Sequence, residues 1–111
     1  MSESEILRKI AVIFVTDVVG FSTLMAQNED LTLRSFRSCK EILDNLFEEH
    51  SGRIFNTAGD SVLAEFPSAV SAVICAVEFQ KLIKARNASV TNAAQMQFRI
   101  GLNMGDVIIE G

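Results

Sequence analysis

Apolar and polar residues follow two different spacings along this chain, and the spacings predict where strands and helices lie. Residues 10–15, IAVIFV, are apolar throughout and rich in β-branched side chains, which is typical of a strand covered on both faces. Residues 31–50 place apolar side chains at steps of three, four and seven, with charged residues between them. This spacing predicts an amphipathic helix that Asp30 caps and that stops in left-handed geometry at Gly52.

A hairpin and a second helix are expected in the middle of the chain. Residues 53–66 predict two short strands around a tight turn at Ala58-Gly59-Asp60. The next helix opens at Pro67 or Ser68 and ends near Ala85. Its many alanines allow it to approach a sheet closely.

The last segment predicts two more strands. Residues 96–111 indicate one strand, a turn near Met104-Gly105 and a final strand, while FSTLMAQ after Gly20 indicates a short helix or an irregular turn. The expected order is strand, helix, strand, strand, helix, strand, strand. We therefore predict an α+β sandwich with the ferredoxin-like βαββαβ order at its centre.

The boundaries of the domain follow from the two ends of this pattern. We expect residues 1–7 to be an N-terminal tail and residues 8–111 to form a domain. An apolar strand pattern runs up to Gly111, whereas domains usually end in a polar or frayed tail. The fold is therefore expected to be incomplete at its C-terminus.

Composition narrows the class of protein. A chain of 111 residues with 49% hydrophobic residues and one proline fits one folded domain. The net charge of -4 disfavours a nucleic acid as partner, but it allows a nucleotide that a metal ion accompanies. No apolar run reaches the length of a membrane helix, so we expect a cytoplasmic protein, with Cys39 and Cys75 as free thiols.

Two acids beside glycine are the candidates for chemistry. Asp17 in TDVVGFS ends the first strand, and Asp60 in AGDS lies in the hairpin turn. Neighbouring strands could bring both carboxylates to one edge, where they repel each other unless a cation lies between them. Mg²⁺ suits such a pair together with phosphate oxygens, and the amides from Val19 to Ser22 could cradle the phosphates. Aspartate beside glycine is also ordinary turn chemistry, and spacing alone leaves both interpretations open.

Three segments carry a resemblance to a known family. IAVIFVTDVVGFSTLM, GRIFNTAGDSVLAEFPSAVSAVICAVEFQ and FRIGLNMGDV together resemble the class III nucleotidyl cyclases, most closely the bacterial adenylate cyclases. The resemblance implies the cyclase catalytic fold and two Mg²⁺ or Mn²⁺ ions held by Asp17 and Asp60. It also implies that the backbone carbonyl of Val18 binds a metal.

The resemblance also implies a reaction and a partner. The backbone around Gly20, Phe21 and Ser22 would meet the triphosphate of ATP, or of GTP in a guanylate cyclase. The ribose 3′-hydroxyl would attack the α-phosphorus and expel pyrophosphate, giving a cyclic nucleotide for signalling. Such sites lie between two catalytic domains, so a homodimer or a head-to-tail pair with another cyclase domain is expected.

Departures from the family pattern affect base choice and activity. Asn56 stands where many members carry a lysine that reads adenine, so the choice of base stays open. The VN-x-A-A-R type segment, whose Asn and Arg support the transition state, is not found in these 111 residues. We expect the chain alone to be nearly inactive, and a non-catalytic nucleotide-binding or dimerisation module is the alternative.

Other polar residues are expected to be structural. Arg99 and Asn103 are predicted to lie on a strand face, and Asp106 is predicted to lie in the last turn. His50 is expected to contact carbonyl groups at the end of its helix.

Overall fold

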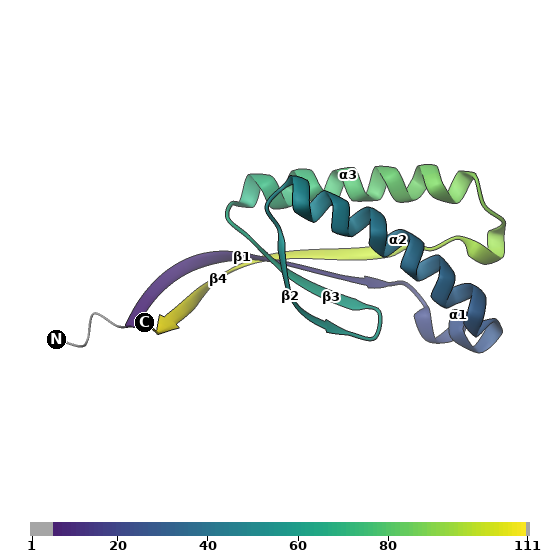
Figure 1. Cartoon of the computed structure of the whole chain (residues 1–111), viewed down its shortest axis with the longest axis horizontal. Helices are drawn as coiled ribbons and strands as arrows, with labels where there is room; N and C mark the ends of the chain where they lie inside the picture. The colour runs from purple at the N-terminus through teal and green to yellow at the C-terminus, as the bar shows by residue number, and fades with distance from the viewer. Residues whose placement is uncertain (1–5, 111) are drawn as a thin grey trace.

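Strand β1 is the centre of the sheet in the computed structural model, which describes the backbone of residues 6–110 and the side chains of residues 9–106. The strand order is β2-β3-β1-β4 and all neighbours are antiparallel. The helices cover one face of this sheet (Figure 1). The elements are β1 (Ile6–Val18), α1 (Phe21–Gln27), α2 (Glu29–Glu49), β2 (Arg53–Ala58), β3 (Ser61–Phe66), α3 (Ala69–Ala88), the 3₁₀ helix η2 (Asn92–Ala94) and β4 (Phe98–Glu110). This is the α+β, ferredoxin-like arrangement that the sequence predicts.

The predicted turn near Met104-Gly105 is wrong, because β4 is one continuous strand. Met104 pairs with Val12 and Gly105 pairs with Ala11. Asp106 accordingly lies within β4, opposite Ile10, and not in a turn. The physical reason is the length of β1, which runs from residue 6 and gives every residue of β4 a backbone partner. The two strands project beyond the rest of the sheet as a two-stranded arm (Figure 1).

Helix α2 begins and ends differently from the prediction. Its cap is Asn28, whose side chain accepts the Leu31 N–H at 3.1 Å, while Asp30 lies in the first turn. At the other end, Ser51 takes the left-handed conformation with a φ of 63°, not Gly52. A Cβ on Gly52 would lie 2.6 Å from Cζ of Phe66, so glycine is needed there for space.

Buried aromatic rings join the sheet to the helices. Phe14 of β1 lies between Phe47 of α2 and Phe66 of β3, with ring centroids 5.1 and 5.6 Å away. A second pair, Phe79 and Phe98, joins α3 to β4 at 5.0 Å. The Phe14–Phe47 and Phe79–Phe98 pairs are edge-on, and such pairs add to the stabilisation from apolar burial. Cys39 and Cys75 are free and fully buried in the same core, as expected.

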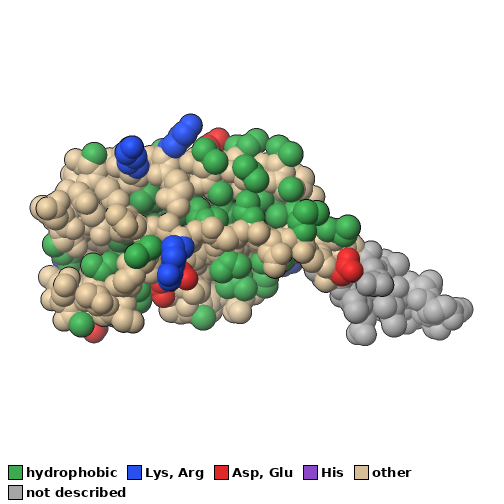
Figure 2. All heavy atoms as spheres, turned by 180° about the vertical axis from the view of Figure 1, so that it is seen from behind, with side chains coloured by type: hydrophobic (Ala, Val, Ile, Leu, Met, Phe, Trp, Pro, Cys, Tyr) green, Lys and Arg blue, Asp and Glu red, His purple; other side chains and the backbone are tan. Residues whose placement is uncertain are grey.

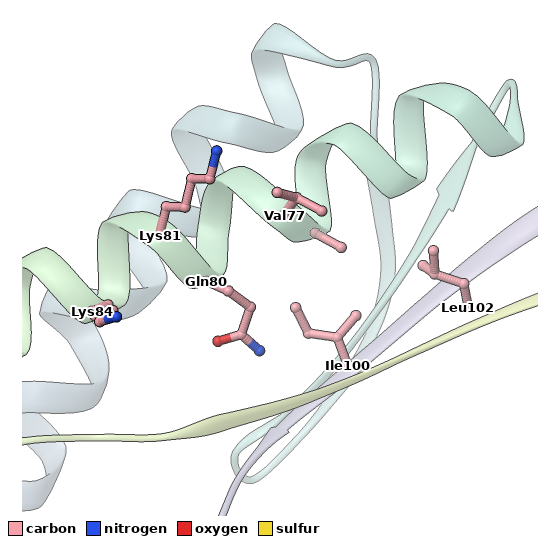
Figure 3. Close-up of a pocket in the computed structure, with 7 residues that line it drawn as sticks. Val77, Gln80, Lys81, Lys84, Ile100 and Leu102 are labelled. Atoms are coloured by element: carbon pink, nitrogen blue, oxygen red, sulfur yellow. The ribbon is translucent and has the colours of Figure 1, made fainter.

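One part of the helix-covered face remains open between α3 and β4. A pocket of about 500 Å³ lies there, and Figure 3 shows its side chains approaching from both elements. Val77 and Leu102 are 48% and 39% exposed, and Figure 2 shows the hydrophobic side chains gathered on this side of the molecule. The lining residues are Ala76, Val77, Gln80, Lys81, Lys84, Ile100 and Leu102. Within the part of the chain that the structure describes, no helix has the length and apolar character needed to cross a membrane.

Candidate active site

Asp17 and Asp60 meet in one pocket, as the sequence predicts. Asp17 is the second-last residue of β1, and Asp60 lies in the turn between β2 and β3. Because β3 pairs with β1 up to Thr16 and Val62, the turn lies directly beside the end of β1. The pocket there has a volume of about 300 Å³, and its lining is Asp17, Val18, Gly20, Phe21, Ser22, Thr23, Asp60, Ser61 and Arg99.

A hydrogen bond from the backbone fixes the carboxylate of Asp60. The Val18 N–H donates to Oδ2 of Asp60 at 2.8 Å. Gly59 makes the approach possible, because its φ of 59° turns the chain tightly between the two strands. The hairpin turn is therefore held against the end of β1 by a charge-assisted hydrogen bond.

Arg99 holds the carboxylate of Asp17 from the neighbouring strand. The two residues are direct cross-strand partners, and Nε of Arg99 donates to Oδ1 of Asp17 at 2.9 Å. Thr16 is buried and its hydroxyl donates to the backbone carbonyl of Arg99 at 2.8 Å, which fixes the strand at this point. Arg99 thus has a place in the pocket that sequence reasoning did not assign to it. Opposite charges that face each other on paired strands attract, so Asp17 and Arg99 could have been matched from the sequence. That match requires the register of β1 and β4, which the sequence does not show.

The backbone after Asp17 is only partly available to a ligand. The Val19 N–H donates to the carbonyl of Gln97 at 2.8 Å. This amide is therefore already paired within the protein, contrary to the expectation that it binds a phosphate. Gly20 has a φ of 68° and precedes α1, and nothing lies within 4 Å of a Cβ placed on it. Gly20, Phe21 and Ser22 all line the pocket, and their contact with phosphate stays a prediction.

Asn56 lies outside the residues that line this pocket. It is exposed on β2 and pairs with Leu63, just after a register shift between Ile54 and Asn56. Leu63 in turn pairs with Val15 of β1. Asn56 therefore lies in the row of residues that crosses β1 at Val15, two residues before Asp17, and its role in base reading stays a prediction.

The oxygen atoms of the pocket fit a hard divalent cation. Among the described residues, one carboxylate oxygen of each aspartate accepts a hydrogen bond, Oδ1 in Asp17 and Oδ2 in Asp60. The second oxygen of each remains available, and Ser22 and Ser61 line the same pocket. Carboxylate and other oxygen ligands are those that Mg²⁺ and Mn²⁺ prefer. The carboxylates of Asp17 and Asp60 thus fit such an ion, and the Val18 backbone carbonyl as a further ligand stays a prediction.

Comparison with known proteins identifies the class to which this fold and pocket belong. The family model described as "Adenylate and Guanylate cyclase catalytic domain" matches residues 3–111. The chain therefore belongs to the class III adenylate and guanylate cyclase catalytic domain family, as the resemblance in the sequence indicates.

Individual relatives agree with this assignment. A Rhizobium meliloti (strain 1021) protein named "Putative adenylate cyclase 3" is 39% identical over 111 residues, which are 99% of this chain and 19% of that protein. The crystal structure of an adenylate/guanylate cyclase/hydrolase from Silicibacter pomeroyi is 34% identical with a TM-score of 0.80, covering 96% of this chain and 62% of that one. A bacterial light-regulated adenylyl cyclase shares the fold, with 23% identity and a TM-score of 0.84 over 94% of this chain and 32% of that one. The chain thus spans about a fifth of the curated relative and less than two thirds of these solved chains.

Proposed function

We propose that this chain is the metal-binding part of an adenylate cyclase and that its aspartate pocket receives the triphosphate of ATP. The observation that carries the proposal is the meeting of Asp17 and Asp60 in one pocket, in a chain of the cyclase family. The two residues are 43 positions apart, and each carboxylate is fixed by its own hydrogen bond. An arrangement with one remaining oxygen on each carboxylate supports binding of two Mg²⁺ or Mn²⁺ ions.

In this proposal, different residues of the pocket bind the metal ions and the triphosphate. Bound divalent ions would supply charge for activating the ribose 3′-hydroxyl and for stabilising the pyrophosphate that leaves. Asp60 is held in position by the Val18 N–H, and Arg99 holds Asp17 from the facing strand. Arg99 also brings a positive charge to a pocket that would receive a highly negative triphosphate. The open space beside Gly20 lets phosphate oxygens approach the backbone closely.

ATP is preferred over GTP in this proposal on one ground. A relative from Rhizobium meliloti that is 39% identical carries an adenylate cyclase name. The amide of Asn56 can both donate and accept a hydrogen bond at the edge of either base, so it does not decide between them. GTP remains the second candidate, because the matching family includes guanylate cyclases.

Catalysis in this proposal requires a second domain. The resemblance to class III cyclases implies a site between two catalytic domains, so in this proposal a partner domain in a head-to-tail pair supplies the Asn and Arg for the transition state. Asn56 at the base-reading position favours a second candidate function, a nucleotide-binding module without catalysis. The two functions differ in whether pairing with a competent partner produces turnover.

A complementation assay tests the proposal. The chain is mixed with a complete cyclase domain of the family in which both metal-binding aspartates have been changed to asparagine. Neither protein has a complete site, but a head-to-tail pair has one. We expect Mn²⁺-dependent formation of cyclic AMP by the mixture and almost none by either protein alone. If a pair forms without turnover, the chain is a binding module, and if cyclic GMP forms faster, it is a guanylate cyclase part.

A further inference from the structure

A second cluster of metal-ligating side chains lies where α2 ends against α3. Glu49 and His50 stand at the end of α2, and Glu78 lies on α3. Each offers one ligand atom, and these three atoms all lie within 4.8 Å of one another. Nε2 of His50 is 3.4 Å from Oε2 of Glu78. Because α2 has 21 residues and rises about 1.5 Å per residue, the cluster is about 30 Å from the start of the helix.

The charges around this cluster favour a cation. Among residues 9–106, the ion pairs of Lys and Arg involve other carboxylates, and none reaches Glu49 or Glu78. The last turn of α2 contains no basic residue, although the end of a helix carries a partial negative charge that attracts cations. Two carboxylates thus stand together at the negative end of a long helix with His50 as their neighbour. A divalent ion would relieve this repulsion.

The buried thiol of Cys75 responds to the same charges. Burial raises its pKa to about 11, and the negative charges of Glu78 and Glu49 contribute to that rise. Cys75 lies on α3, three residues before Glu78, and is fully buried. The field of the two carboxylates therefore reaches the packed contact between α2 and α3.

Hydrogen bonds fix the backbone on both sides of Ser51, where α2 ends. The His50 N–H donates to the carbonyl of Leu46 at 3.0 Å, and the Gly52 N–H donates to the carbonyl of Phe47 at 2.7 Å. Gly52 itself is packed against Phe66 and Phe47. The His50 side chain is only 19% exposed. A ligand whose position is fixed before binding loses less entropy when the metal arrives.

We propose that Glu49, His50 and Glu78 form a binding site for a divalent transition metal of the Zn²⁺ class, separate from the aspartate pocket. One imidazole nitrogen and two carboxylate oxygens are a ligand set that Zn²⁺ accepts, with water completing a tetrahedral shell. The imidazole distinguishes the site from one for Mg²⁺ or Ca²⁺, which prefer oxygen. Bound Zn²⁺ would fasten the end of α2 to α3 and stabilise the fold.

Zinc titration of the untagged chain tests this site. The experiment uses the chain with Asp17→Asn and Asp60→Asn, so that metal in the aspartate pocket does not contribute. We expect one equivalent of Zn²⁺ to bind in calorimetry and to raise the melting temperature, since a ligand of the folded state stabilises it. The same concentration of Mg²⁺ should leave the melting temperature unchanged.

Substitutions within and beside the cluster decide the outcome. His50→Gln and Glu78→Gln should each lower the Zn²⁺ affinity at least about tenfold, as losses around metal sites do. Glu48→Gln, an exposed neighbour outside the cluster, is the matched control and should bind like the parent. Circular dichroism checks that each variant is folded. The proposal is overturned if the chain with only Asp17→Asn and Asp60→Asn binds no Zn²⁺ at micromolar concentrations. It is also overturned if adding His50→Gln and Glu78→Gln together leaves the Zn²⁺ affinity unchanged.

Discussion

Gly20 and Gly52 stand near the two ends of the α1–α2 segment, and they show how different these regions are. Gly20 has a φ of 68°, and nothing lies within 4 Å of a Cβ placed on it. At Gly52 the φ is not positive, but a Cβ would lie 2.6 Å from Phe66 and 3.1 Å from Phe47. The first glycine is needed for its backbone conformation and the second for the space it leaves. We call the region of Gly20 the open end, because the space beside that glycine is free, and the region of Gly52 the closed end, because two phenyl rings fill the space beside that glycine.

The acidic residues at the two ends also differ in the partners of their carboxylates. At the open end, Asp17 has an arginine partner and Asp60 has a backbone N–H partner. At the closed end, the partner of Glu78 is a histidine. Charge-assisted hydrogen bonds fix Asp17 and Asp60 as a prepared site, whereas Glu78 has the ring of His50 as its neighbour. Substitutions at each end should consequently affect different properties.

Removal of a carboxylate at the open end should have the largest effect. In the complementation assay, Asp60→Asn or Asp17→Asn in this chain should lower the formation of cyclic nucleotide at least about 100-fold, comparable to the loss of a key electrostatic contact. The asparagine Oδ1 can still accept the Val18 N–H, so the fold is retained. Asp44→Asn on α2, whose partner is Lys40, is the control and should keep full activity. Equal losses in all three variants would contradict the assignment of the pocket.

Filling the closed end should affect stability and leave binding intact. In Gly52→Ala the new methyl group overlaps the ring of Phe66, and overpacking of this kind costs about 1–3 kcal/mol in the free energy of unfolding. Urea denaturation followed by circular dichroism measures the change. Nucleotide affinity per folded molecule should stay within twofold of the parent, because the aspartate pocket lies at the other end. An unchanged free energy of unfolding in Gly52→Ala would contradict this prediction, because it would mean that the ring of Phe66 moves aside at little cost.

Gly20→Ala should have a smaller effect on stability, arising from backbone conformation alone. A left-handed non-glycine residue costs about 1–2 kcal/mol, and no neighbour clashes with the new methyl group. Gly105→Ala is the matched control, since Gly105 also has open space and its φ is not positive. The control should be neutral or slightly stabilising in the same urea experiment. Equal costs at both positions would mean that the φ of Gly20 is not the cause.

The start of α2 gives the smallest expected change. Asn28→Ala removes the side chain that accepts the Leu31 N–H and should cost about 1 kcal/mol. Asp30→Ala keeps that cap and loses only a favourable charge near the start of the helix, which is worth about 0.3–1 kcal/mol. Thermal unfolding of both variants ranks them. A larger loss for Asp30→Ala would restore the cap that the sequence predicts.

Local pattern was enough to predict much of the fold and the two acids of the candidate site. The steps of three, four and seven located α2, and glycine beside Asp17 and Asp60 indicated both acids. Arg99 was not assigned to the site, because its contact with Asp17 depends on the register of β1 and β4, which connects residues 82 positions apart. The turn at Met104-Gly105 was wrongly predicted for the same reason, because the pairing of β4 with β1 was not known. Glycine weakens a strand locally, but pairing with a long β1 overrides that preference.

Local sequence pattern also did not predict the cluster of Glu49, His50 and Glu78. His50 is the only histidine of the chain and has no second ligand at a spacing that the sequence would reveal. Its neighbour Glu78 is 28 positions away and arrives only when α3 packs against α2. The position of His50 near the helix end predicted that its ring contacts carbonyl groups there, and this prediction is wrong. The structure instead pairs the ring with Glu78, while the His50 backbone N–H donates to Leu46.

Metal-dependent binding of a triphosphate is the most direct test of the aspartate pocket. A nonhydrolysable ATP analogue is titrated into the chain by calorimetry, with Mn²⁺ or with EDTA, and into the Asp17→Asn, Asp60→Asn double variant. The account predicts saturable binding that requires Mn²⁺ and is lost in the double variant, with the variant's fold unchanged by circular dichroism. Equal affinity in the double variant, or equal affinity in EDTA, would contradict the claim that these two aspartates hold the metal–triphosphate complex.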